Sequence, residues 1–211
     1  MIKGIIFDMD GVILDSEKLH AKVEQKLFKD LKIEMTEEEK QRFIGIPFKR
    51  ALIDFIRRKK ILHDPDEVTE LKIKRMLNVM DKLHTIPQTV DFIKKYHGKF
   101  RFAVVTSTEK ELTIPQLERF GLLEYFDAII TPELVSNPKP DPEPFKIAAR
   151  KLNLKKYECI IIEDSINGIK SAKSAGIKVV GLEGTFPAEK LDYADLVVDE
   201  ISYEKLRPLL E

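Results

Sequence analysis

Two aspartates, Asp8 and Asp10, stand two residues apart after a short apolar stretch near the start of the chain. The stretch Gly4–Phe7 has the composition of a buried strand, so these aspartates are expected at the carboxyl end of a parallel sheet, where open α/β folds hold ligands. Neighbouring carboxylates repel each other unless one is protonated or a cation lies between them. Oxygen ligands without His or Cys favour Mg²⁺. The alternative is that both are ordinary turn residues.

Hydroxyl groups follow a second apolar stretch, the predicted strand Phe102–Thr106. The side chains of Thr106, Ser107 and Thr108 can donate hydrogen bonds to a phosphate oxygen. Threonine is also common inside strands, so this motif is weak evidence when it is taken alone.

A lysine lies between prolines in the segment Asn137–Pro144. Because proline fixes its own torsion and restricts the residue before it, Lys139 is expected on a stiff turn. A rigidly held ammonium can neutralise a bound anion beside several carboxylates. Asp141 and Pro142 are expected as the N-cap and first residue of the next helix. The alternative for Lys139 is a plain surface turn.

Two further acids, Glu163 and Asp164, end the apolar stretch Cys159–Glu163. Carboxylates at a buried edge lower stability unless they bind a partner, which indicates a functional reason for both. A metal site shared with Asp8 would supply that reason. Ser165 is expected to cap the helix that follows.

These residues together fit phosphoryl transfer. Asp8 can attack phosphorus and form an aspartyl-phosphate. Asp10 can protonate the leaving oxygen and then deprotonate the attacking water. Thr106 and Lys139 can hold the equatorial oxygens, where negative charge spreads in the transition state, while Mg²⁺ spans the phosphate and the acids.

Six apolar stretches are predicted to be the strands that place these residues. From the second onward they alternate with helical patterns, which is typical of an α/β fold with a parallel, Rossmann-like sheet covered by helices on both faces. The predicted strands are Gly4–Phe7, Phe102–Thr106, Ala128–Thr131, Cys159–Glu163, Lys178–Leu182 and Leu196–Val198.

About ninety residues separate the first predicted strand from the second, far more than the dozen or so, with a helix, that a crossover needs. Residues 16–83 show helical periodicity and no convincing strand, and Thr36 with Glu39 forms a capping box. We therefore expect an all-helical cap at 16–83, inserted into a core formed by 1–15 and 84–211. The hinges are expected near Leu14–Ser16 and Leu83–Pro87.

The composition limits the partners. The chain has 36 basic and 36 acidic residues, so no net charge attracts nucleic acid or an anionic membrane. No apolar stretch approaches the length of a membrane span, so we expect neither a membrane span nor a secretory leader. The one cysteine, Cys159, excludes an internal disulfide and is expected to be buried and unreactive. We expect a cytoplasmic monomer that binds a small phosphate ester, without nucleic acid or membrane.

The chain resembles the haloacid-dehalogenase-like (HAD) hydrolase superfamily, and within it the β-phosphoglucomutase-like phosphatase branch. The resemblance covers nearly the whole chain and rests on four motifs in order: Asp8–Val12, Thr106, Lys139 within Asn137–Pro142, and Glu163–Gly168. It implies a Rossmann-like core with a helical cap inserted after the first strand. It also implies Mg²⁺ bound by Asp8, the backbone carbonyl of Asp10 and Asp164, with Glu163 bound to the ion or supporting its ligands.

The predicted cap departs from the mutases of this branch. In the mutase pattern a lysine precedes the cap glycine, and an arginine follows that glycine by three residues. Here Ile44 precedes Gly45 and Phe48 takes the later position, with Lys49 and Arg50 just beyond. His20 matches a histidine of the helix after the hinge, which phosphatases also have. The candidate substrate-binding residues are Thr106, Ser107, Lys139, His20, Gly45, Lys49 and Arg50.

The sequence thus predicts a Mg²⁺-dependent phosphatase that hydrolyses small phosphorylated metabolites, with sugar phosphates as candidates. One alternative is a β-phosphoglucomutase that interconverts β-glucose 1-phosphate and glucose 6-phosphate. An alternative of another class is a phospho-accepting signalling receiver domain. The order of the motifs argues against a receiver, which has adjacent acids after its first strand and needs no large cap.

Overall fold

The computed structural model describes residues 1–211 and contains one six-stranded parallel sheet in the order β5-β4-β1-β6-β7-β8. The predicted strands are confirmed, and their bounds differ from the prediction by one residue at most. The strands are β1 (Gly4–Phe7), β4 (Arg101–Val105), β5 (Ala128–Ile130), β6 (Cys159–Glu163), β7 (Lys178–Leu182) and β8 (Leu196–Val198).

Strand β1 lies inside the sheet and pairs with β4 on one side and β6 on the other. Phe7 is in register with Val104 and with Ile162. The next residues of all three strands therefore emerge together at the carboxyl edge of the sheet.

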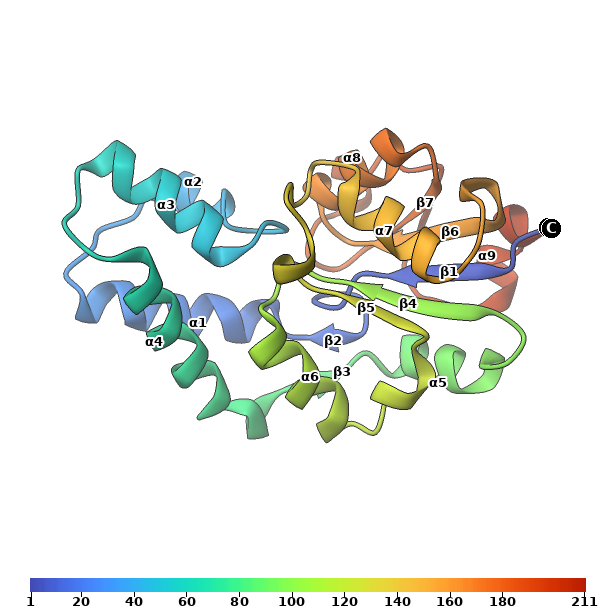
Figure 1. The fold of residues 1–211 in the computed structure, drawn as a ribbon, viewed down its shortest axis with the longest axis horizontal. Helices are drawn as coiled ribbons and strands as arrows, with labels where there is room; N and C mark the ends of the chain where they lie inside the picture. Colours follow the sequence, from blue (N-terminus) through green and yellow to red (C-terminus); the bar gives the residue numbers. More distant parts are fainter.

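Helices cover both faces of the sheet (Figure 1). Alternate side chains of β1 point to opposite faces, so Ile5 and Phe7 belong to one apolar core and Ile6 to the other. The first core is closed by α5 (Pro87–Tyr96), α6 (Lys110–Arg119) and α9 (Tyr203–Leu210), and the second by α7 (Glu143–Lys151) and α8 (Ile166–Ala175).

The start of α7 differs slightly from the sequence prediction. The helix begins at Glu143 rather than at Pro142. Asp141 still satisfies an exposed helix donor, because its Oδ1 accepts a hydrogen bond from the backbone N–H of Glu143 at 2.9 Å. Ser165 caps α8 as expected, accepting from the N–H of Gly168 at 3.0 Å.

The long connection between β1 and β4 contains four α-helices before α5, drawn in blue to teal in Figure 1 and set apart from the sheet. The capping box of Thr36 is present, and helices begin at or just after Pro47 and Pro65. An apolar core of its own, rich in Phe28, Phe43, Phe48 and Phe55, holds this part together. The helices are α1 (Glu17–Asp30), α2 (Glu37–Gln41), α3 (Phe48–Lys59) and α4 (Pro65–Leu77).

The two connections to this helical insertion run side by side. Strand β2 (Leu14–Asp15) pairs with β3 (His84–Thr85) in an antiparallel clasp, and Ile86 N–H donates to the carbonyl of Ile13 at 2.8 Å. The sequence analysis did not predict these strands, because two residues are too short for a periodic pattern.

None of the helices has both the length and the apolar composition needed to cross a membrane.

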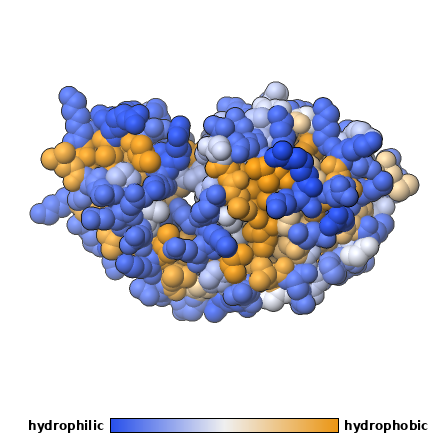
Figure 2. Space-filling model, in the orientation of Figure 1, coloured by the Kyte–Doolittle hydropathy of each residue, from blue (hydrophilic) through white to orange (hydrophobic).

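In the space-filling view a narrow notch separates the helical insertion from the sheet-containing part (Figure 2). Short 3₁₀ helices complete the chain. The 3₁₀ helices are η1 (Met80–Lys82), η2 (Leu123–Tyr125), η3 (Pro132–Leu134), η4 (Lys156–Glu158) and η5 (Ala188–Lys190).

Candidate active site

A buried ion-pair network lies at the carboxyl edge of the sheet. Lys139 Nζ donates to Asp8 Oδ1 at 2.5 Å, to Glu163 Oε1 at 2.5 Å and to the carbonyl of Val105 at 3.0 Å. The side chain of Lys139 is 3% exposed and that of Glu163 is fully buried. All three donor protons of the ammonium are therefore used, and the group is held in one place.

This network has one ammonium group, that of Lys139, among several carboxyl groups. Burial works against the ammonium, but Asp8 and Glu163 raise the pKa of Lys139 above its ordinary value, so it stays charged. Burial raises the pKa of Asp8 well above its usual range, and Glu163 and Asp10 raise it further, although Lys139 opposes them. One buried cation thus does not fully balance the carboxylates around it.

Glu163 is fixed by the turn that begins α8. Its Oε2 accepts hydrogen bonds from the N–H of Asp164 at 3.1 Å, the N–H of Ser165 at 3.0 Å and the hydroxyl of Ser165 at 2.9 Å. A β-carbon on Gly168 would lie only 1.8 Å from Glu163 Oε1, so this position requires glycine. With Lys139 on its other oxygen, Glu163 has both oxygens occupied.

Asp164 faces Asp8 across a turn made by Gly11. A β-carbon on Gly11 would lie 1.9 Å from Asp164 Oδ2, and its φ of +76° also favours glycine. The hydroxyl of Thr185 donates to that same oxygen. Burial, together with the negative charges of Asp8 and Glu163, raises the pKa of Asp164 well above its ordinary value.

The carboxylates of Asp8, Glu163 and Asp164 form a group that could hold a metal ion, with one oxygen of each within 4.8 Å of the others. Asp8 Oδ2 and Asp164 Oδ1 accept no hydrogen bond, whereas both oxygens of Glu163 do. Burial and the neighbouring negative charges raise the pKa values of Asp8 and Asp164, so a cation bound between these carboxylates would be stabilised. An all-oxygen set of this kind fits a hard divalent ion.

Asp10 has a separate set of partners. Its Oδ1 accepts from the hydroxyl of Ser16 at 2.5 Å and lies 3.3 Å from His20 Nε2. Its Oδ2 accepts from the hydroxyl of Thr106 at 3.2 Å and that of Thr108 at 2.7 Å. The carboxylate is therefore aimed away from Lys139.

These partners keep Asp10 ionised. Burial alone would raise its pKa, but the contact and charge of His20, with the hydroxyls of Ser16 and Thr108, lower the pKa of Asp10 well below its usual range. In return, Asp10 raises the pKa of the His20 imidazole despite burial of that ring. The pair has the electrostatics of an imidazolium beside a carboxylate.

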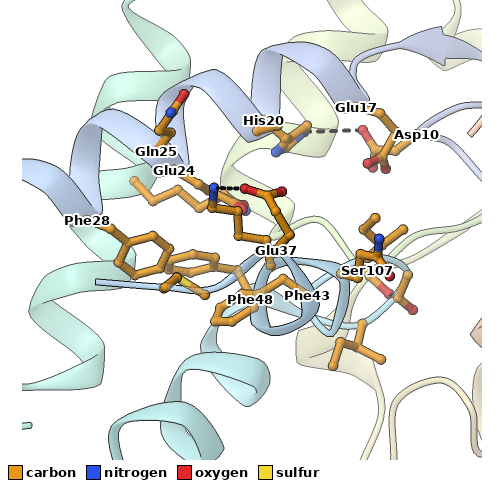
Figure 3. A pocket seen from close by; sticks show the side chains of 18 of the residues that line it. Asp10, Glu17, His20, Glu24, Gln25, Phe28, Glu37, Phe43, Phe48 and Ser107 are labelled. Atoms are coloured by element: carbon orange, nitrogen blue, oxygen red, sulfur yellow. Dashed lines mark hydrogen bonds and ion pairs between the residues drawn. The ribbon is translucent and has the colours of Figure 1, made fainter. Parts of the chain in front are cut away.

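A cavity of about 700 Å³ opens from these aspartates toward the helical insertion. Figure 3 shows it between α1 on one side and Phe43, Phe48 and Glu37 on the other. This volume is in the range of small-molecule sites. Its wall includes polar groups near Asp8 and Asp10 and aromatic rings farther away.

The structure brings most of the predicted site residues together. Asp8, Asp10, Thr106, Lys139, Glu163 and Asp164 meet at the sheet edge, and His20 and Ser107 line the cavity beside them. Gly45 also lines it, and its carbonyl accepts from the Ser107 hydroxyl at 3.1 Å, which joins the insertion to the sheet.

Two predicted residues lie elsewhere. Lys49 and Arg50 are exposed on α3, outside the cavity wall, and Lys49 pairs with Asp66. The reason is the apolar stripe of α3: Ala51, Leu52 and Phe55 face the core of the insertion, which turns the two cations outward.

The sequence analysis also missed several groups. Ser16 and Thr185 contact the aspartates, and Glu17, Glu24 and Lys72 line the cavity. The spacing of Glu17, His20 and Glu24 on one predicted helix was an available signal for part of this set. The other residues are brought in by tertiary packing and carry no local pattern.

The family model for haloacid dehalogenase-like hydrolases matches residues 5–182. The chain is 30% identical over 178 residues to fructose-1-phosphate phosphatase YqaB of Escherichia coli, covering 84% of this chain and 94% of that protein. It is 27% identical over 213 residues to the β-phosphoglucomutase of Bacillus subtilis, covering 95% and 91%. A β-phosphoglucomutase crystal structure from Clostridium difficile superimposes with a TM-score of 0.88 at 26% identity, covering 100% of this chain and 97% of that one.

Proposed function

We propose that this chain, which belongs to the haloacid dehalogenase-like hydrolases and is a phosphomonoesterase of that family, hydrolyses small phosphorylated metabolites. Sugar phosphates are among the proposed substrates. The proposed intermediate is an aspartyl-phosphate on Asp8. Mg²⁺ is the proposed cofactor. One observation carries the proposal: Asp8 has one oxygen bonded to Lys139 and the other free, and it lines a cavity large enough for a small metabolite.

In the proposed reaction Asp8 Oδ2 attacks phosphorus, the bond from phosphorus to the leaving oxygen breaks, and the phosphoryl group is transferred to the carboxylate while the leaving oxygen takes a proton from Asp10. Lys139 and the hydroxyl of Thr106 are proposed to bind the equatorial oxygens of the transferring group. Each would exchange a present hydrogen bond for the phosphate, Lys139 one of its three and Thr106 the one to Asp10. Water then attacks the same phosphorus and releases inorganic phosphate, which regenerates Asp8.

Asp10 is proposed as the acid and then the base. In the resting structure it is a carboxylate, the form that accepts a proton from the attacking water. To act first as the acid it needs a proton, and His20, whose Nε2 lies 3.3 Å from Asp10 Oδ1, is the titratable group proposed to supply it. The hydroxyls of Ser16 and Thr108 hold the side chain in reach of both partners.

Asp8 and Asp164 are the proposed ligands of the ion, with the backbone carbonyl of Asp10, which accepts no hydrogen bond. A bound Mg²⁺ would supply charge neutralisation for the phosphate and the crowded carboxylates. Because both its oxygens are occupied, Glu163 is proposed to hold Lys139 and the α8 turn rather than to bind the ion.

Residues 16–83 are proposed as a cap domain over a core of 1–15 and 84–211. The insertion touches the core beside the site: Ser107 donates to the carbonyl of Gly45, and Asn167 Nδ2 donates to the carbonyl of Ile44 at 3.1 Å. Leu112 of α6 also packs with Val23 and Met76 of the insertion. Such a cover excludes bulk water while the phosphoryl group is transferred.

We further propose that the protein is a monomer and is located in the cytoplasm.

The mutase alternative lacks support in the cap. A mutase must hold a distal phosphate with a fixed cationic group, and neither Lys49 nor Arg50 lines the cavity. The receiver-domain alternative does not agree with the family of the chain.

A phosphate-release assay on a panel of phosphorylated metabolites, with and without EDTA, tests this proposal. We expect release from sugar monophosphates that requires Mg²⁺. Release that is unaffected by chelator, or no release from any ester in the panel, would contradict it.

A further inference from the structure

One face of α1 forms a wall of the cavity. Glu24 and Phe28 follow Glu17 by seven and eleven residues, and this spacing places all three side chains on the same face of a helix. All three line the cavity together with His20. Figure 3 shows Glu17 beside Asp10, Glu24 farther along, and Phe28 at the far end. A molecule whose phosphate lies at Asp8 therefore meets two acids first and aromatic rings afterwards.

The cation nearest this wall is already paired. Lys72 of α4 lies 3.4 Å from Glu24 Oε1 and 4.5 Å from the centre of the Phe48 ring, and its side chain is 5% exposed. Burial works against its charge, but Glu109 and Glu24 raise the pKa of Lys72, so the ammonium is compensated by protein carboxylates. It therefore offers little attraction to another anion.

The other lysines of the cavity wall are at its outer end. Lys29 and Lys32 are exposed, and Lys40 pairs with Glu37 at 2.5 Å. Lys29 is twelve residues beyond Glu17, about 18 Å along the helix axis. A second phosphate on the same sugar as the reacting phosphate would lie beside the acids, short of these lysines.

The remaining wall suits an uncharged, hydroxyl-bearing group. Carboxylates accept hydrogen bonds from hydroxyls, and a buried ammonium can donate to them. Phe28, Phe43 and Phe48 present rings against which the C–H face of a sugar or cyclitol can pack. No group on this wall requires a negative charge on the ligand.

We propose that Glu17 and Glu24 determine the substrate class of this enzyme, selecting phosphomonoesters with an uncharged, hydroxyl-bearing leaving group and rejecting esters that carry a second phosphate. The inference rests on the proposed phosphatase function and assigns its specificity to two residues of the cap.

The test compares fructose 1-phosphate and fructose 6-phosphate with fructose 1,6-bisphosphate, which shares a reacting phosphate with each of them. The value of kcat/KM is measured with saturating Mg²⁺, and p-nitrophenyl phosphate reports the chemical step without a sugar. We expect the better monophosphate to exceed the bisphosphate by about tenfold or more at pH 8, above the pKa of about 7 of Glu17, because the second phosphate is then repelled by both carboxylates.

The variants Glu24→Gln and Glu17→Gln keep the shape of the side chain and remove its charge. We expect each to reduce the monophosphate preference by about threefold or more, mainly by lowering KM for the bisphosphate. Glu70→Gln is the matched control, since Glu70 is an exposed glutamate of α4 outside the cavity wall. It removes the same charge from the protein and should leave the preference unchanged.

An equal or greater preference for the bisphosphate in the wild type would overturn the inference, as would an unchanged ratio in both variants. If p-nitrophenyl phosphate is hydrolysed in those cases, the proposed function stands and the specificity assignment fails alone. If no ester is hydrolysed, both fail.

Discussion

The Nζ atom of Lys139 lies 2.5 Å from Oδ1 of Asp8, in a buried ion pair at the end of the central strand. This pair leaves Oδ2 as the only free oxygen of Asp8 and directs it toward the cavity. In the proposed reaction the lysine therefore leaves one oxygen of Asp8 available to attack a phosphate.

We predict that Asp8→Asn lowers kcat by about a thousandfold or more while the fold is retained, because the amide keeps the shape of the side chain and loses the attacking charge. Phosphate release and circular dichroism measure the two effects. Asp91→Asn, at an exposed position of α5, is the control. Turnover within about tenfold of wild type would remove Asp8 from the nucleophilic role.

Lys139→Met is predicted to destabilise the protein by about 3–5 kcal/mol, because Asp8 and Glu163 are left as buried carboxylates without their cation. Urea unfolding gives the change. Adding Glu163→Gln to the same chain removes one of those charges and should recover part of the loss. Equal stability of the single variant and wild type would show that the ion pair contributes nothing.

Divalent metal should stabilise the wild-type fold. At a Mg²⁺ concentration about one hundred times the Kd, binding adds about 2.7 kcal/mol to the free energy of unfolding. Asp164→Asn should raise the melting temperature in EDTA, since it relieves carboxylate repulsion, and lose most of the increase with Mg²⁺. Ca²⁺, with its larger and less regular shell, should inhibit phosphate release. A wild-type melting temperature that does not change when Mg²⁺ is added would count against this site.

Hydrolysis is predicted to exceed isomerisation. With β-glucose 1-phosphate as substrate and glucose 1,6-bisphosphate added, we expect release of phosphate and negligible formation of glucose 6-phosphate, because Lys49 and Arg50 lie outside the cavity. A coupled glucose 6-phosphate dehydrogenase assay follows isomerisation in parallel with phosphate release. Faster isomerisation would identify a mutase, and Lys49 and Arg50 would then be the first residues to replace.

Glu17 makes the stability depend on pH. Burial and the negative charge of Asp10 raise the pKa of Glu17 to about 7, from an ordinary value of 4.5. The folded state therefore binds this proton more tightly than the unfolded state, and the resulting stability, complete below pH 4.5, is lost as the pH rises through 7. Relative to wild type, Glu17→Gln should gain on the order of 1–2 kcal/mol between pH 5 and pH 8.

Urea unfolding in EDTA at the two pH values measures this difference. Glu70→Gln, which changes an exposed glutamate of α4, should follow the wild-type curve. A Glu17→Gln protein with the wild-type dependence on pH would show that Glu17 has an ordinary pKa.

The sheet could be predicted from the sequence because buried parallel strands are continuous apolar stretches, as in Cys159–Glu163. The meeting of Asp8, Lys139 and Asp164 followed from strand order, since parallel strands end at one edge. The partners of Asp10 could not be found in this way. Ser16 and Thr108 reach it from an insertion hinge and a loop, so their contacts depend on how separate elements pack.

The clasp of β2 and β3 places the two ends of the helical insertion beside each other, with Leu14 paired to Thr85. About seventy residues thus leave and rejoin the core at one point, and closing a loop of that length costs only about 4 kcal/mol of chain entropy. Insertions of different length and sequence could be exchanged at this junction if they keep Ser16 and His20, the two residues of the insertion that contact Asp10. The clasp is therefore a natural site for recombination between relatives with different substrates.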